Sequence, residues 1–174
     1  ICFNQGMGIE MCSLKNGGLS LIARNRIESN EGWNTFCDSE GELGVGPIGG
    51  IGIGVDSSGG YPITSYIINS NDGTGIYIHT SSAKSGLIQG NEIRGNQDDG
   101  VGIYHSSAGD RTIGDNSIED NLGAGIWLGP ASRYTASGNT CKDNGYGIYL
   151  DSSSHNNTIY LNNFIDNTDN GYSE

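Results

Sequence analysis

Three aspartates recur at a fixed interval and have the right chemistry for a metal site. Asp120, Asp143 and Asp166 are each followed by asparagine, and successive members lie 23 residues apart. If their segments stack side by side, the carboxylates lie about 5 Å apart, and each repulsion is about 3 kcal/mol before solvent relaxes it. This repulsion favours a bound cation, with Ca²⁺ the natural candidate, or one raised pKa. Solvated side chains that splay apart would also relieve it.

The same carboxylates offer a catalytic alternative. Asp120 and Asp143 are a candidate acid/base pair, because glycoside hydrolysis uses two carboxyl groups about 5–9 Å apart. A second candidate cation site combines two adjacent aspartates with one from the preceding repeat; its members are Asp72, Asp98 and Asp99.

Aromatic residues recur in a different position. The aligned position is filled, in order, by Gly54, Tyr77, Gly102, Trp127 and Tyr149, and Tyr104 and Tyr146 lie nearby. Rings on the outer face of a flat sheet would suit sugar stacking, and their polar tips also suit a protein interface. The candidate binding residues for a glycan or partner are Tyr77, Tyr104, Trp127 and Tyr149. Alternatively, the aromatics only cover the sheet, because such residues favour strands.

An internal repeat must position all these side chains. The unit Asn-x-apolar-x-x-Asn occurs at Asn25–Asn30, Asn91–Asn96, Asn116–Asn121, Asn139–Asn144 and Asn162–Asn167, with a degenerate copy at Tyr66–Asn71. From Tyr66 onward the copies begin 25, 25, 23 and 23 residues apart. A second unit, Gly-apolar-x-apolar, accompanies the copies at Gly8, Gly52, Gly75, Gly100, Gly125 and Gly147. Such a period indicates a stacked repeat architecture.

The aligned copies give four apolar columns. One of them, two residues after the first asparagine, contains Ile27, Ile68, Ile93, Ile118, Cys141 and Phe164. Each apolar stretch is short and alternates with polar positions, which is the periodicity of a strand with one buried face. The repeat therefore predicts an all-β parallel solenoid with coils of about 22–25 residues, in which neighbouring coils supply the core.

The second asparagines have a structural explanation. At a tight turn, an inward amide can satisfy backbone groups and bond the equivalent asparagine of the next coil. We expect such a ladder from Asn71, Asn96, Asn121, Asn144 and Asn167, and we exclude these residues as catalytic candidates.

The period is interrupted once. Residues 31–50, "EGWNTFCDSEGELGVGPIGG", form an insertion of about one coil's length at a turn. Long excursions from a rigid scaffold often carry function, although a packing loop is the alternative. Residues 1–174 otherwise form one domain. Neither end has an obvious cap, so we expect a fragment of a longer solenoid or self-association through uncapped ends.

Charge and cysteine content limit the partners. The chain has 20 acidic and 8 basic residues and a net charge of −12, which disfavours nucleic acid and anionic membrane surfaces. No run of about 20 apolar residues would insert into a membrane. Cys2, Cys12, Cys37 and Cys141 fit no zinc motif; Cys12 could pair with Cys2 or Cys37, or all four could be free thiols.

The repeat resembles a known family. "GNEIRGNQDDGVGIYHSS" (90–107), "DNSIEDNLGAGIWLGPAS" (115–132) and residues 144–171 resemble the right-handed parallel β-helix family of carbohydrate-binding proteins and sugar hydrolases. Within it they look most like the branch of the periplasmic copper-insertion accessory protein of nitrous-oxide reductase and many archaeal surface proteins. The resemblance implies a right-handed, single-stranded parallel β-helix. No Met/His-rich copper tract and no Asp-Pro-His-Glu signature of the epimerases is present.

Two hypotheses about function follow. The first is a non-catalytic extracellular, cell-surface or periplasmic β-helix module that acts as a rigid scaffold, adhesion or assembly element and binds glycan or another surface protein. The alternative is a polysaccharide-acting enzyme that uses outward carboxylates, with hydrolysis favoured over lyase or epimerase chemistry because basic residues are few.

Overall fold

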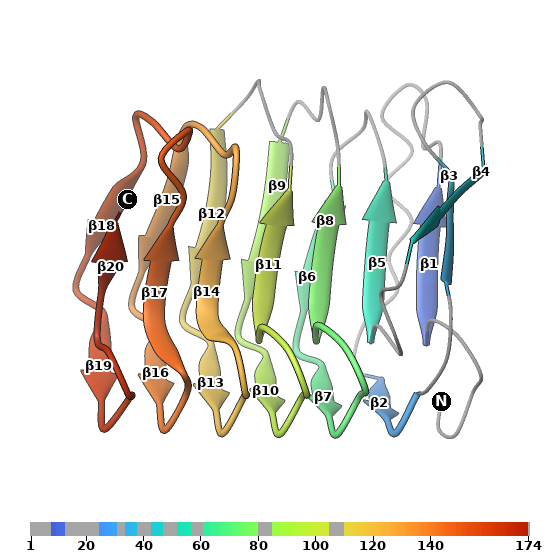
Figure 1. The fold of residues 1–174 in the computed structure, drawn as a ribbon, viewed down its shortest axis with the longest axis horizontal. Helices are drawn as coiled ribbons and strands as arrows, with labels where there is room; N and C mark the ends of the chain where they lie inside the picture. Colours follow the sequence, from blue (N-terminus) through green and yellow to red (C-terminus); the bar gives the residue numbers. More distant parts are fainter. Residues whose placement is uncertain are drawn as a thin grey trace.

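The fold is a stack of parallel coils. The computed structural model describes residues 8–12, 25–30, 34–37, 43–46, 52–56, 61–79, 85–104 and 110–173. These ranges contain β-strands and no helix, and the strands form three parallel sheets along one common axis, with one antiparallel pair besides (Figure 1). The all-β parallel solenoid predicted from the repeat is confirmed.

Successive coils add neighbouring strands to the three sheets. Sheet I contains β1 (Ile9–Cys12), β5 (Ile53–Asp56), β8 (Ile76–His79), β11 (Val101–Tyr104), β14 (Ala124–Leu128), β17 (Tyr146–Leu150) and β20 (Tyr172–Ser173). Sheet II contains β2 (Arg26–Glu28), β7 (Ile67–Asn69), β10 (Glu92–Arg94), β13 (Ser117–Glu119), β16 (Thr140–Lys142) and β19 (Asn163–Ile165). Sheet III contains β6 (Tyr61–Thr64), β9 (Ser85–Gln89), β12 (Asp110–Gly114), β15 (Tyr134–Ser137) and β18 (Thr158–Tyr160).

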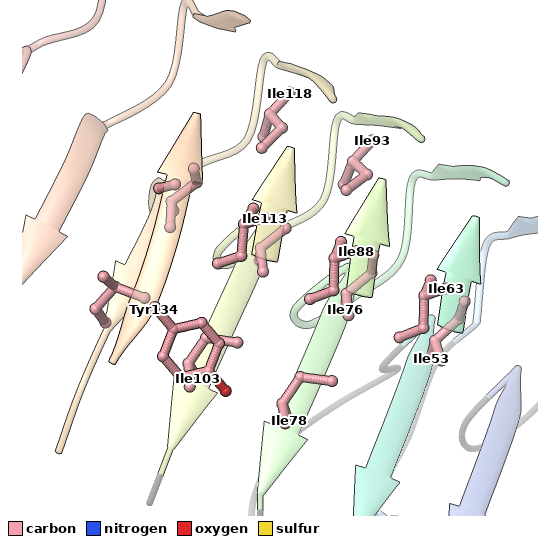
Figure 2. Packing of buried hydrophobic residues seen from close by; sticks show 14 of the residues in the cluster. Ile53, Ile63, Ile76, Ile78, Ile88, Ile93, Ile103, Ile113, Ile118 and Tyr134 are labelled. Atoms are coloured by element: carbon pink, nitrogen blue, oxygen red, sulfur yellow. The ribbon is translucent and has the colours of Figure 1, made fainter. Parts of the chain in front are cut away.

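The core consists of the predicted apolar columns. In sheet II, the strand register pairs Ile93 with Ile68 on one side and with Ile118 on the other, and Cys141 with Ile118 and Phe164. Side chains from the three sheets meet inside the stack, where the column residues from Ile27 to Cys141 are fully buried (Figure 2). Each coil therefore buries its apolar face against its neighbours, as a solenoid requires.

Asparagine ladders hold the turns between the sheets. In the predicted ladder, each side-chain Nδ2 donates to the Oδ1 of the next coil at 2.7–3.1 Å; its members are Asn30, Asn71, Asn96, Asn121, Asn144 and Asn167. The first asparagines form a second ladder between sheets III and II, made by Asn91, Asn116, Asn139 and Asn162. The side-chain amides of both ladders therefore hold neighbouring coils together, as the sequence predicted for the ladder that contains Asn71 and Asn96.

The residue before each ladder asparagine has a left-handed backbone. In the turn between sheets II and I, the positive-φ residues are Ser29, Ser70, Gly95, Asp120, Asp143 and Asp166. Glycine and short polar residues adopt this conformation most readily, because aspartate, asparagine and serine can hydrogen-bond locally. The aspartate column therefore has a conformational explanation that needs no ligand.

Close approach explains the glycine that precedes each strand of sheet I. A Cβ on Gly75 would lie 2.8 Å from the Gly100 carbonyl oxygen, 2.8 Å from Ile93 Cγ2 and 2.9 Å from Asn96 Nδ2. Because Gly75 has no side chain, the start of strand β8 can lie against both the asparagine ladder and the apolar core. The same arrangement recurs in the following coils.

The insertion has some structure of its own. Within residues 31–50, β3 (Asn34–Cys37) and β4 (Leu43–Gly46) pair in antiparallel orientation, where the sequence predicted a loop. The proposed disulfide partners Cys2, Cys12 and Cys37 lie outside the residues whose side chains the structure describes. The same holds for His105.

Candidate functional site

The outer face of sheet I carries a continuous row of aromatic rings. The row, called the aromatic row below, consists of Tyr77, Tyr104, Trp127, Tyr149 and Tyr172. Consecutive ring centroids are 4.5, 4.0, 6.5 and 4.9 Å apart. Successive side chains of a strand point to opposite faces of the sheet. Trp127 lies between the buried Ile126 and Leu128, so its side chain points away from the core.

The N-terminal part of the row is packed within itself. The rings of Tyr77 and Tyr104 are tilted by 34° to one another, and those of Tyr104 and Trp127 by 40°. Tyr104 lies over Gly102, where a Cβ would come within 2.8 Å of its ring. Tyr77 is only 6% exposed. These faces are therefore occupied by neighbouring rings rather than offered to a ligand.

The C-terminal part of the row is open. Tyr146 is 37% exposed and Tyr172 is 41% exposed, and both contact Tyr149, one at 5.4 Å in an edge-on arrangement and the other at 4.9 Å in a stack. Tyr146, Tyr149 and Tyr172 are called the open tyrosine cluster below. Tyr172 was missed as a candidate because its segment lacks the Gly-apolar-x-apolar pattern. Its spacing of 23 residues from Tyr149 was the available signal.

Asp99 is a buried carboxyl group next to the row. Its Oδ1 accepts the Ala124 backbone N–H at 2.7 Å, and its Oδ2 accepts the Tyr104 hydroxyl at 3.3 Å. Burial and then the charge of Asp98 raise the pKa of Asp99 to about 7, against the lowering effect of these two hydrogen bonds. Shifts of this kind are common at functional sites.

The candidate cation site around Asp99 is not supported. Asp98 accepts the Thr74 hydroxyl at 2.9 Å, Asp99 is bonded to Ala124 and Tyr104, and Asp72 is exposed. The carboxylates of the two adjacent aspartates thus already have partners from the fold itself.

Asp120 and Asp143 line a shallow hollow of about 350 Å³ on the turn between sheets II and I. Leu122, Gly145 and Thr168 of successive coils also line the hollow. Asp166 does not line it.

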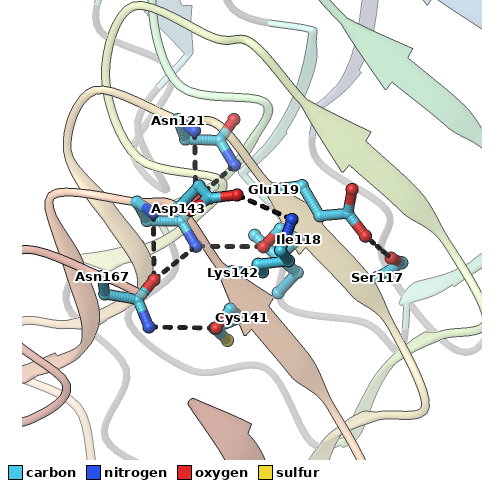
Figure 3. Close-up of polar contacts among 9 residues, drawn as sticks. Ser117, Ile118, Glu119, Asn121, Cys141, Lys142, Asp143 and Asn167 are labelled. Atoms are coloured by element: carbon cyan, nitrogen blue, oxygen red, sulfur yellow. Dashed lines mark hydrogen bonds and ion pairs between the residues drawn. The ribbon is translucent and has the colours of Figure 1, made fainter. Parts of the chain in front are cut away.

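Asp143 is neutralised in part by an adjacent lysine. Lys142 Nζ lies 2.8 Å from Asp143 Oδ2 (Figure 3). The hydrogen bond to Asp143 and the charge of that carboxylate raise the pKa of Lys142. One of the two candidate acid/base carboxylates is therefore ion-paired on the surface.

The described residues do not make a metal centre. Within the described ranges, no three His, Cys, Asp or Glu side chains lie close enough to hold a metal ion, so the predicted Ca²⁺ sites receive no support. Cys141 is fully buried in a core column, and burial raises the pKa of its thiol to about 12. His155 Nδ1 is 3.0 Å from the Ser153 carbonyl oxygen.

A known protein family matches most of the chain. The family model described as "Periplasmic copper-binding protein (NosD)" matches residues 10–174. Neither the search of the curated proteins nor that of the solved structures found a significant match. Among the described residues, no helix is long and apolar enough to cross a membrane.

Proposed function

The chain belongs to the family of the periplasmic copper-binding protein NosD, and from this premise we propose that it is a non-catalytic scaffold that binds neutral glycan through its open tyrosine cluster. The family is periplasmic, which agrees with the predicted location outside the cytoplasm. The described residues bring no three His, Cys, Asp or Glu side chains together, so they supply no copper site of that kind.

One observation carries the proposal. Tyr77, Tyr104 and Trp127 pack on one another, whereas Tyr146 is 37% exposed and Tyr172 is 41% exposed, and both contact the ring of Tyr149. Ring faces pack on the apolar faces of sugars, and the hydroxyls exchange hydrogen bonds with sugar hydroxyls. An open platform of this kind suits a long chain that lies across the surface.

The charge of the protein selects among glycans. A net charge of −12 opposes the approach of uronate or sulfated polymers. The neutral hydroxyls of a glucan or mannan meet no such barrier. The ligand class is therefore neutral polysaccharide.

The scaffold role is favoured over catalysis. Asp120 and Asp143 occupy left-handed turn positions that Ser70 and Gly95 occupy in other coils, and Asp143 pairs with Lys142. Both aspartates thus have conformational roles in the coil.

Affinity electrophoresis through gels that contain neutral glucans, mannans, galactans or chitin derivatives tests the proposal. We expect at least one of these polymers to retard the wild-type protein, and the double variant Tyr146→Ala/Tyr172→Ala to lose the retardation, because the open rings are removed. The matched control is Tyr160→Ala, whose ring is 49% exposed but lies on sheet III.

Two results would overturn the proposal: wild-type protein that no neutral polymer retards, or a double variant retarded as much as Tyr160→Ala. Release of reducing ends from a retarding polymer, abolished by Asp143→Asn, would show instead that the protein is a hydrolase.

A further inference from the structure

We propose that the closed part of the aromatic row is a one-electron relay: an oxidising equivalent on Trp127 moves to Tyr104, whose phenolic proton passes to Asp99. This inference is independent of glycan binding. It rests on the closed part of the row and on the buried carboxylate beside it.

The rings form an unbroken path. From Tyr172 to Tyr77, no two consecutive centroids are more than 6.5 Å apart, and the two steps around Tyr104 are 4.0 and 4.5 Å. Indole and phenol are the side chains that proteins oxidise most readily after thiols, and rings in contact exchange electrons by short tunnelling steps. The sheet register aligns Trp127 with Tyr149 and Tyr149 with Tyr172, and Tyr104 reaches the row by lying over Gly102, which is aligned with Tyr77 and Trp127.

The path has an accessible end and a shielded end. Tyr146 and Tyr172 are exposed, whereas Tyr77 is buried and Tyr104 is half-buried. An inorganic radical that oxidises indole in preference to phenol, such as azide radical, starts the relay at Trp127. The shielded end is where a radical would be protected from solvent.

Tyr104 is the expected end point because it has a base. Oxidation of a phenol without loss of its proton produces a strongly acidic cation, so a hydrogen-bonded carboxylate makes the step favourable. Tyr104 Oη donates to Asp99 Oδ2 at 3.3 Å. The other groups facing this carboxylate are Asp98 in its own turn and the Ala124 N–H of β14.

The transfer step balances. At pH 8 the oxidised Trp127 has released its N–H proton, so the indolyl radical takes one electron from Tyr104 and one proton from solvent, while the Tyr104 proton moves to the ionised Asp99. The products are neutral Trp127, a neutral Tyr104 phenoxyl radical and the Asp99 carboxylic acid. The initiating oxidant is reduced by one electron, so azide radical becomes azide ion.

Pulse radiolysis with azide radical, which oxidises indole in preference to phenol, tests the relay at pH 8. The protein carries Trp33→Phe, so that Trp127 is its single tryptophan. We expect the indolyl absorption to decay while phenoxyl absorption grows at the same rate, independent of protein concentration. Tyr104→Phe and Asp99→Asn should each lose this fast phase.

The controls separate the relay from general effects on the fold. Tyr160→Phe removes an exposed tyrosine away from the row and should keep the fast phase. Near-ultraviolet circular dichroism verifies that each variant is folded. The relay is refuted if the wild type shows no concentration-independent transfer, or if Tyr104→Phe and Asp99→Asn both transfer at the wild-type rate.

Discussion

Replacing Asn121 with alanine is expected to lower the free energy of unfolding by about 4 kcal/mol, because it leaves two buried donors without an acceptor. Asn121 Oδ1 accepts the backbone N–H of Asn96 at 3.1 Å and its Nδ2 at 2.8 Å. Its own Nδ2 donates to Asn144 Oδ1 at 2.9 Å. Water cannot replace these bonds readily, since Asn121 is only 2% exposed.

Denaturation in urea, followed by far-ultraviolet circular dichroism, measures the effect of Asn121→Ala. The matched control is Asn163→Ala, an exposed asparagine of β19 whose Nδ2 donates a long hydrogen bond of 3.5 Å to Thr140 Oγ1. The control should stay within about 0.5 kcal/mol of the wild type. Equal stability of the two variants would contradict the structural role of the ladder.

Asp99→Asn is expected to stabilise the protein at pH 8 by about 4 kcal/mol and to have little effect near pH 4. Burial and the Asp98 charge raise the pKa of Asp99 from 3.8 to about 7. Between these values the unfolded chain has released the Asp99 proton while the folded protein retains it. Stability is therefore lost as pH rises from about 4 to about 7, and the loss is complete above that range.

An asparagine side chain at position 99 can keep the contacts that Asp99 makes. Its Oδ1 still accepts from Ala124, and its amide can donate to the Tyr104 oxygen, so the variant removes the charge and keeps the contacts. Unfolding free energies of the variant and the wild type are compared from pH 4 to pH 9, with the exposed Asp72→Asn as control. A difference between Asp99→Asn and wild type that stays constant over this range would contradict the assignment.

The coil architecture could be predicted from the sequence because each coil repeats the same local requirements. Ile93, Asn96 and Gly100 have equivalents at fixed spacings, and each type has one dominant reason for its place: burial, amide bonding and close approach. The alignment of copies therefore predicts the strand register directly.

The sites were harder to predict because they depend on side-chain packing across coils. Tyr77, Trp127 and Tyr149 were found by alignment, but the sequence did not show that Tyr104 folds over Gly102 and closes the row. Likewise, Asp99 was singled out as a cation ligand. Its bonds to Ala124 and Tyr104 involve a neighbouring coil and a residue five positions later, and no motif records them.

The most direct test of the proposed function is a residue-resolved titration. Nuclear magnetic resonance of protein with labelled tyrosine rings and leucine methyl groups follows the addition of an oligosaccharide from the polymer that retards it most. We predict saturable shifts at Tyr146, Tyr149 and Tyr172, with Tyr77 and the Leu122 methyl groups unchanged. Shifts confined to Leu122, or no saturable shift at the open tyrosine cluster, would contradict the proposed function.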